Sequence, residues 1–584
     1  MKILLTAINA KYIHANLAVY SLAAYAGDSG ADIKIAEYTI NHQKEEILKG
    51  IYMEKADVVA FSCYIWNIEF VLEIAQLLKR VAPQTKVWLG GPEVSYDAKA
   101  LMAAHHEIDG IMCGEGEETF KKLSECYVNS EKKGCRPEDE FSNIFGLVYR
   151  KDNDIYVNQP APLMDMDCLP FVYDDLTLFE HKIIYYESSR GCPFSCSYCL
   201  SSIDKKVRFK RTALVKEELK KLLDARVPQV KFVDRTFNCR HQHTMEIWQF
   251  IKENDNGVTN FHFEITADLL NEAEIELLNT MRPGLVQLEI GVQSTNPETL
   301  KEIRRVMDFH QLSDIVKKIA DGHNIHQHLD LIAGLPFEDL KSFKKSFNDV
   351  YSLKPQQLQL GFLKVLKGSW MHENREAYGL VYTPKPVYEV LSTKWLSFED
   401  ILFLKGIEAV VEIFYNSHQF EKTIEYLSRF FENAFDFYAA LAAYYEKNKL
   451  NEMNHKRLAR YEHLLDFSKE TSAEPGLVKA MLIYDLYARE HLKSRPLWAG
   501  DREHKKEETA AFFSDNKQLS AYLPDRAGMS YRQIRFETHL EYFEYDMKTA
   551  WESGRAVRRE YKILFDYGHR DALTYEALTI HIVS

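Results

Sequence analysis

The sequence lacks a long apolar stretch. No run reaches the roughly eighteen consecutive apolar residues that a membrane-spanning helix needs, although apolar residues make up 46% of the chain. The first residues, "MKILLTAINAKYIH", carry one early lysine and no small-residue cleavage site. This is typical of a first strand rather than a signal peptide. We therefore expect no membrane span and a cytoplasmic location.

The chain also has no excess of positive charge. It holds 73 Lys and Arg against 86 Asp and Glu, which gives a net charge of −13. This balance offers no electrostatic reason to bind nucleic acid or an anionic membrane. The basic run "DKKVRFKRT" at 204–212 is more typical of a solvated surface than of a nucleic-acid groove. As substrate we expect a small metabolite, a lipid or a peptide rather than a nucleic acid.

Cysteine is scarce, and its distribution excludes a disulfide framework. The nine cysteines are an odd number spread over 584 residues, which fits a reducing compartment. Three of them, Cys192, Cys196 and Cys199, nevertheless crowd into "ESSRGCPFSCSYCLSS" at 187–202. Structural zinc usually takes four ligands in two pairs, and no second pair lies at the expected spacing. A [4Fe–4S] cluster held by three thiolates would keep one iron open.

The spacing CxxxCxxC resembles that of the radical S-adenosylmethionine (SAM) superfamily. The resemblance implies that Cys192, Cys196 and Cys199 bind a [4Fe–4S] cluster and that SAM binds its open iron. It also implies that an electron from a donor such as flavodoxin or ferredoxin cleaves SAM to a 5′-deoxyadenosyl radical. By the same resemblance Tyr198 packs beside the adenine.

Strand and helix patterns alternate around and after the cysteines. Alternation at this spacing predicts βαβ units and a parallel sheet, with active residues at the carboxyl ends of the strands. We assign residues 176–370 to a partial (β/α)6 barrel. The expected strands are 182–189, 229–236, 261–266, 285–294, 326–336 and 357–365.

Further positions in this region resemble SAM-binding residues. "GVQSTNPETLKEIRR" (291–305) resembles the fourth-strand segment of coproporphyrinogen-oxidase-like radical SAM enzymes, and "GLP" at 334–336 resembles the fifth-strand signature. Taken singly, Arg305 also suits a surface helix and Asp330 a strand-end turn. The SAM-binding residues that the resemblance implies are Tyr198, Glu264, Gln293, Ser294, Arg305 and Asp330.

A second alternation fills the N-terminal residues 1–135. Five apolar strands begin at "KILLTAI" (2–8) and alternate with helices, which predicts a doubly wound, Rossmann-like sheet with a ligand crevice at the carboxyl ends of its strands. No GxGxxG follows the first strand, so a dinucleotide is disfavoured.

Loops at those strand ends resemble the cobalamin-binding domain of cobalamin-dependent radical SAM enzymes. The resemblance rests on "LGGPEVS" and "CGEGEETF", placed ahead of the cysteine motif, and it covers about residues 1–370. Paired glycines allow close backbone approach, and the aromatic residues suit a flat macrocycle, although they also suit a cap over the core. The implied cobalamin-binding residues are Asn9, Lys11, Tyr12, Tyr64, Trp66, Asn67, Gly91, Glu93, Gly114, Glu115 and Glu117.

The loop after the first strand departs from the family pattern. Many cobalamin domains supply a lower axial histidine from Asp-x-His-x-x-Gly, whereas "YIHANL" has Tyr12 and Leu17 at the Asp and Gly positions. Without the Asp, nothing orients the imidazole of His14. We expect cobalamin bound without a histidine ligand.

The remaining segments are less specific. Charge followed by proline across 129–175 predicts an exposed loop, and we treat 136–175 as a linker. Residues 371–584 form a mainly helical domain that ends in a strand pair and resembles an uncharacterised C-terminal extension of cobalamin radical SAM proteins. We expect it to close the open barrel and shape the substrate pocket. Further candidates for contacts with a substrate are the polar groups of Trp498, Asp501, Arg502 and His504.

The resemblance implies a radical SAM enzyme that uses a [4Fe–4S] cluster, SAM and cobalamin. The leading hypothesis is a C-methyltransferase that acts on an unactivated carbon through a 5′-deoxyadenosyl radical and methylcobalamin. A cyclisation or rearrangement without methyl transfer is the alternative. A cobalamin-dependent sensor is a third hypothesis, which the intact SAM motifs argue against.

Replacing Cys192, Cys196 and Cys199 together by Ala should abolish the cluster, because three of its four irons each need a thiolate. Anaerobically reconstituted wild type should show one [4Fe–4S] cluster by iron analysis and EPR. A four-iron EPR signal together with SAM cleavage in the triple variant would assign the cluster to other residues.

Overall fold

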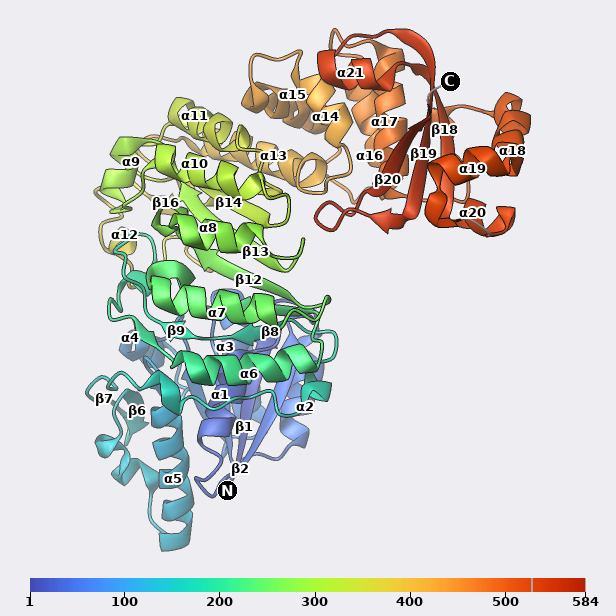
Figure 1. The fold of residues 1–584 in the computed structure, drawn as a ribbon. Helices are drawn as coiled ribbons and strands as arrows, with labels where there is room; N and C mark the ends of the chain where they lie inside the picture. The colour runs from blue at the N-terminus through green and yellow to red at the C-terminus, as the bar shows by residue number, and fades with distance from the viewer. Residues whose placement is uncertain (527–528, 583–584) are drawn as a thin grey trace.

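The computed structural model describes residues 1–526 and 529–582. It contains two α/β units, each built around parallel strands, and then a helical domain with a small sheet, as the sequence predicts (Figure 1). No helix in the described ranges is both long and apolar enough to cross a membrane.

The N-terminal unit is a doubly wound sheet with the strand order β2-β1-β3-β4-β5. These strands are parallel, and β1 is almost fully buried because helices cover both faces. The order reverses between β1 and β3, where an open sheet forms its ligand crevice. The elements are β1 (Lys2–Asn9), α1 (Leu17–Tyr25), β2 (Asp32–Thr39), α2 (Lys44–Met53), β3 (Val58–Ser62), α3 (Ile68–Val81), β4 (Lys86–Gly90), α4 (Ala98–Ala104), β5 (Gly110–Met112) and α5 (Glu117–Lys133).

The expectation of an exposed loop across 129–175 was wrong in one part. Strands β6 (Leu147–Lys151) and β7 (Asp154–Val157) form a hairpin that pairs antiparallel with β5 and extends the sheet. Asp152 and Asn153 both have positive φ, as the tight turn of a two-residue hairpin requires. The charged residues around this turn mask the short apolar alternation of the strands.

The middle unit is an open parallel barrel whose strands run in chain order, with β8 and β15 at its edges. Aromatic side chains fill its core near the first strands, where the rings of Phe237 and Phe263 lie 4.3 Å apart. The barrel elements are β8 (Ile184–Tyr186), α6 (Thr212–Asp224), β11 (Gln229–Phe232), α7 (His241–Glu253), β12 (Asn260–Ile265), α8 (Glu272–Asn279), β13 (Val286–Gln293), α9 (Pro297–Glu302), α10 (Phe309–Ala320), β14 (His326–Ala333), α11 (Leu340–Tyr351) and β15 (Gln357–Phe362).

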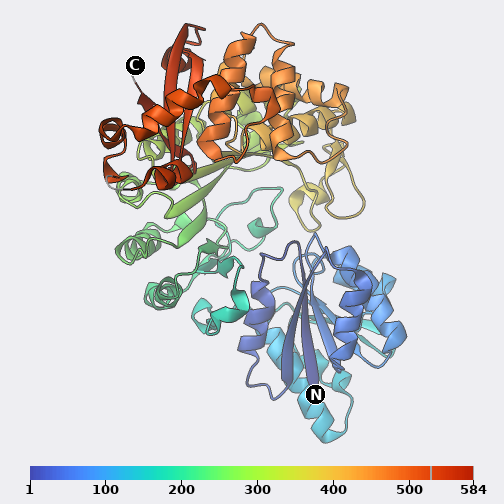
Figure 2. The same cartoon turned by 90° about the vertical axis from the view of Figure 1, so that its right-hand side faces the viewer.

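The C-terminal unit packs on the β15 side of the barrel, at the end far from the N-terminal sheet (Figures 1 and 2). Helix α13 contacts β15, and α15 contacts α11. The predicted strand pair is present and is joined by a third strand, β18. The elements are α13 (Phe398–Phe414), α14 (Glu421–Ser428), α15 (Ala434–Lys447), α16 (Arg457–Ser468), α17 (Pro475–Arg489), α18 (Lys506–Ser514), α19 (Asn516–Tyr522), α20 (Tyr531–Glu537), β18 (Thr538–Tyr545), α21 (Met547–Ser553), β19 (Arg558–Arg570) and β20 (Ala577–Ile582).

A segment between barrel and C-terminal unit returns to the N-terminal unit. It holds α12 (Trp370–Glu373), β16 (Val381–Tyr382) and β17 (Val390–Ser392). Lys367 forms a 2.8 Å ion pair with Asp97, and the hydroxyl of Tyr388 donates to the carboxylate of Glu93. This segment therefore links the two α/β units from the side opposite the chain connection.

Candidate active site

The carboxyl ends of the two parallel sheets face one another across a cleft with two chambers. The chambers have volumes of about 520 and 450 Å³. We call the first the aromatic chamber and the second the glycine chamber. Both are lined by Tyr64 and Glu117 from the N-terminal unit and by Glu187, Arg190 and Arg235 from the barrel. Groups bound at either sheet would therefore share this space.

The glycine chamber lies at the ends of β4 and β5. Gly91 has a φ of +114°, and a Cβ there would lie 2.5 Å from the carbonyl oxygen of Cys63, so only glycine fits. Gly114 also has a positive φ, and a Cβ at that position would meet no atom within 4 Å. The backbone is thus bare toward the chamber, as close approach of a large ligand requires.

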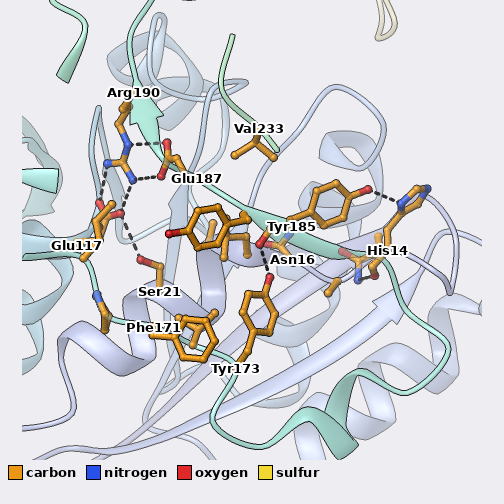
Figure 3. A pocket seen from close by; sticks show the side chains of 18 of the residues that line it. His14, Asn16, Ser21, Glu117, Phe171, Tyr173, Tyr185, Glu187, Arg190 and Val233 are labelled. Atoms are coloured by element: carbon orange, nitrogen blue, oxygen red, sulfur yellow. Dashed lines mark hydrogen bonds and ion pairs between the residues drawn. The ribbon is translucent and has the colours of Figure 1, made fainter. Parts of the chain in front are cut away.

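The aromatic chamber holds stacked and edge-on rings (Figure 3). The rings of Tyr64 and Trp66 are stacked with their centroids 4.5 Å apart. The hydroxyl of Tyr173 donates to the carbonyl oxygen of Tyr185, and the hydroxyl of Tyr185 lies 2.7 Å from Nδ1 of His14. His14 therefore has one ring nitrogen engaged by the barrel, and burial lowers its pKa.

Arg190 joins the two units at the boundary between the chambers. Its guanidinium donates to Glu187 at 2.8 Å and to Glu117 of the N-terminal unit at 2.9 Å, as Figure 3 shows. Burial would lower the pKa of Arg190, but the two carboxylates raise it above its ordinary value. The guanidinium remains charged and rigidly held.

Other residues predicted to bind cobalamin are also held by the chain itself. Glu115 accepts from Arg208 beside the cysteine loop, and Glu93 accepts from Tyr388. Asn67 donates to the carbonyl oxygens of Ile8 and Ser62, and Asn9 donates to Glu37 and to the carbonyl oxygen of His14. Through these contacts the residues hold the loops at the strand ends in place.

Four of the predicted residues do not line either chamber, namely Lys11, Tyr12, Asn67 and Glu93. The side chain of Tyr12 is 65% exposed. The structure thus brings Asn9, Tyr64, Trp66, Gly91, Gly114, Glu115 and Glu117 to the cleft.

The cysteine loop follows β8 and is held by backbone hydrogen bonds. Gly191 has a φ of +99°, and a Cβ there would lie 2.7 Å from the carbonyl oxygen of Lys206. The amide of Cys192 donates to Asp204, and the amide of Ser197 donates to the carbonyl oxygen of Ile303. Short strands β9 (Ser189–Arg190) and β10 (Arg208–Phe209) close the base of the loop. The cysteines are therefore carried on an ordered scaffold.

The three thiol sulfurs are not gathered as they would be around a single zinc ion. Among the described residues, they do not form a group whose ligand atoms all lie within 4.8 Å of one another. A zinc ion with Zn–S bonds of about 2.3 Å would bring them to about 3.8 Å. In a [4Fe–4S] cluster each thiolate binds a different iron, which needs a wider spacing.

One of the predicted SAM-binding residues, Arg305, lies beside Cys196. Arg305 reaches within 3.9 Å of the sulfur of Cys196 and also donates to the carbonyl oxygen of Gly291. Its Nε and the Oε1 of Gln293 are buried without a hydrogen-bond partner among the described residues. Buried polar atoms are normally paired, so these two atoms are available to a ligand.

The other predicted SAM-binding residues differ in their surroundings. Burial raises the pKa of Glu264 at the end of β12 to about 7. Ser294 donates to Glu338 at 2.8 Å, and Asp330 lies 3.0 Å from Nε2 of His328. Ser294 is therefore engaged within the chain. Asp330 has a charged neighbour, but its Oδ1 forms no hydrogen bond among the described residues, and Glu264 lies at the open strand end.

Sequence reasoning missed Asp234, which positions the start of the cysteine loop. This fully buried carboxylate follows β11 and accepts from the amide and hydroxyl of Ser188 and from the hydroxyl of Ser189. The hydroxyl of Thr236, two residues on, lies 3.6 Å from the sulfur of Cys192. The signal was present in "FVDRT", since a carboxylate directly after a buried strand needs donors.

Three family models match consecutive parts of the chain. A B12 binding domain matches residues 3–124, the radical SAM superfamily matches 186–350, and a protein family of unknown function, DUF4080, matches 376–565. The chain is a cobalamin-dependent radical SAM protein. The glycine chamber lies within the first match, and all three cysteines lie within the second.

Relatives of this radical SAM protein include methyltransferases and a cyclase. It is 26% identical over 349 residues to the uncharacterized methyltransferase PH0819 of Pyrococcus horikoshii, covering 58% of this chain and 73% of that protein. It is 24% identical to the cobalamin-dependent radical SAM methyltransferase TokK of Streptomyces tokunonensis, covering 59% of this chain but only 52% of TokK. It is 25% identical to the anaerobic magnesium-protoporphyrin IX monomethyl ester cyclase of Synechocystis, covering 40% and 47%.

Two solved structures share the fold. OxsB with aqua-cobalamin and SAM bound has a TM-score of 0.57 at 14% identity, covering 83% of this chain and 80% of OxsB. TsrM from Kitasatospora setae with cobalamin and a [4Fe–4S] cluster has a TM-score of 0.54 at 16% identity, covering 66% and 78%. The fold is therefore shared with one protein solved with cobalamin and SAM and with another solved with cobalamin and a [4Fe–4S] cluster.

Asp234→Leu should lower the iron content of the reconstituted radical SAM protein. It leaves the amide of Ser188 and two hydroxyls without their acceptor, at about 1–3 kcal/mol for each unsatisfied group. Asp234→Asn is the matched control, because it keeps an acceptor and should retain most of the iron. Equal iron in the Leu variant and wild type would exclude this positioning role.

The wild type and Asp234→Asn should also differ in how their stability depends on pH. Burial raises the pKa of Asp234 to about 6 from 3.8. The wild type should therefore lose stability as pH rises from about 4 to about 6, because the buried carboxyl must ionise. Thermal unfolding of Asp234→Asn between pH 4 and 7 should show a smaller loss, and parallel curves would contradict the shift.

Proposed function

We propose that this protein is a methyltransferase that transfers a methyl group to an unactivated carbon of its substrate. When bound, SAM and the cluster supply a 5′-deoxyadenosyl radical, and cobalamin supplies the methyl group. The observation that carries the proposal is the cleft in which the strand ends of both units meet. Hydrogen abstraction and methyl delivery on one carbon need both groups within reach of the same substrate atom.

We assign the cluster and SAM to the barrel side of the cleft. Cys192, Cys196 and Cys199 would hold the cluster. Arg305 and Gln293, each with a buried unpaired atom, would bind the methionine part of SAM. The tasks of these residues are to orient SAM and to replace its hydration shell with fixed partners.

Glu264 and Tyr198 would complete this SAM site. With a pKa of about 7, Glu264 holds or releases a proton near neutral pH and would accept from the amino group or ribose of SAM. Tyr198 is partly buried and lies next to Cys199 in the loop. Its ring would pack beside the adenine.

Cobalamin is assigned to the N-terminal side. Gly91 and Gly114 leave the backbone bare for close approach of a large ligand, and the stacked rings of Tyr64 and Trp66 offer a flat apolar surface. His14 would not serve as a ligand, because its ring is oriented by Tyr185 of the barrel.

The substrate and the electron donor belong to this proposal as well. The aromatic chamber, lined by rings with Arg235, Lys210 and Glu187 among them, suits a substrate with an apolar body and a polar end. A peptide, lipid or small metabolite fits this description. A flavodoxin or ferredoxin would deliver the electron.

A second candidate function is cyclisation or rearrangement without methyl transfer. The match to the anaerobic magnesium-protoporphyrin IX monomethyl ester cyclase favours it, since that relative aligns with 40% of the chain. The same cleft would serve this reaction. The two candidates differ in what becomes of SAM.

Product stoichiometry separates them. In anaerobic reactions of reconstituted protein with reductant, cell extract and SAM, methyl transfer should yield 5′-deoxyadenosine and S-adenosylhomocysteine in similar amounts per turnover. Chromatography with mass spectrometry measures both, with the triple cysteine-to-alanine variant as control. Deoxyadenosine alone, formed together with a substrate-derived product, would exclude methyl transfer and favour cyclisation.

A further inference from the structure

The C-terminal unit contains a separate cavity with an excess of positive charge. The cavity has a volume of about 590 Å³ and lies between the start of α17, residues 495–505 and strands β18 and β19. Six Lys and Arg residues line it against three Asp and Glu residues, whereas acidic residues outnumber basic ones in the whole chain. The basic residues of this cavity are Lys479, Arg495, Arg502, Lys505, Arg558 and Arg559.

A buried carboxylate organises the inner wall of the basic cavity. Glu541 is 1% exposed and pairs with both Arg495 and Arg502. One carboxylate therefore faces two guanidiniums, which leaves a positive excess at the wall. The Nη1 of Arg502 is buried without a hydrogen-bond partner among the described residues, and burial lowers the pKa of this arginine. An anion in the cavity would accept a hydrogen bond from this Nη1 and would stabilise the charged form of the arginine.

Two further cations have no carboxylate partner in the described part of the chain. They are Lys479, the fifth residue of α17, and Arg558, which lies 5.9 Å from the ring centre of Tyr545. Gly500 has a φ of +80°, and a Cβ there would lie 3.2 Å from Nζ of Lys479, so the glycine leaves room for this ammonium group. Cations without a carboxylate partner inside a concavity are typical of an anion site.

The start of α17 adds to the positive potential. Glu474 precedes the helix but forms no side-chain cap bond, and Gly476 of the first turn lines the cavity. Amide groups at the N-terminus of a helix attract anions. The rings of Tyr542 and Tyr545 line the rest of the space and offer a surface for an organic group.

We propose that this cavity binds a phosphate or pyrophosphate group of a small organic molecule. Lys505 and Arg559 are paired with Glu508 and Asp546, so the positive excess comes from the other four basic residues. Two of these share one carboxylate and two have none, and charge-assisted bonds from arginine and lysine suit phosphate oxygens. The volume falls in the range of small-molecule sites and exceeds that of the phosphate group alone, which leaves space for an organic body beside the tyrosines. The site is separate from the cleft between the two α/β units.

Isothermal titration of the full-length reconstituted protein with inorganic pyrophosphate tests the proposal. The variant Lys479→Gln/Arg558→Gln removes two cavity cations without stranding a carboxylate, so it should fold. Its dissociation constant should rise about tenfold or more, because two charge-assisted contacts to the phosphate oxygens are lost. The control Lys506→Gln/Lys548→Gln removes two charges from exposed lysines of the same unit that do not line the cavity.

The control should bind pyrophosphate like the wild type, and circular dichroism should show all three proteins folded. Binding should also weaken as NaCl is raised. Equal affinity in both double variants, or no binding to the wild type at low salt, would overturn the proposal. If the cavity variant fails to fold, the single variant Lys479→Gln decides, and unchanged affinity in it would count against the site.

Discussion

The arrangement of the site depends on ion pairs that join the two α/β units at their strand ends. Arg190 follows the first barrel strand and binds Glu117 at the start of α5, and Arg208 binds Glu115 in the same loop. These pairs are partly or wholly buried, so separating the units would leave charges without partners at a substantial energetic cost. They hold the glycine chamber against the cysteine loop.

The same contacts explain why several acidic residues gather in loops that resemble a ligand site. Glu93, Glu115 and Glu117 each accept from a residue of another unit, namely Tyr388, Arg208 and Arg190. A glutamate that bridges two units stabilises the surface that faces a nearby ligand. The glycines line the glycine chamber, and the stacked aromatic rings line the aromatic chamber.

Much of the fold could be predicted from local pattern. The apolar strands of both α/β units, such as β1 and β13, are flanked by helices of clear periodicity, and their positions are confirmed. The cysteine spacing led to the radical SAM assignment, which the family match confirms. The β6–β7 hairpin was missed because charged residues interrupt its short strands. Asp234 and Arg190 were missed because their roles depend on partners 46 and 73 residues away in the chain.

The central claim is that cobalamin and the cluster act on opposite sides of one cleft. Pulsed EPR of protein loaded with cob(II)alamin and a reduced [4Fe–4S] cluster tests this claim directly. The account predicts that cluster reduction shortens the relaxation time of the cob(II)alamin spin through dipolar coupling, and that the triple cysteine-to-alanine variant shows no such effect. A cob(II)alamin signal that is unchanged on cluster reduction in the wild type would contradict the account.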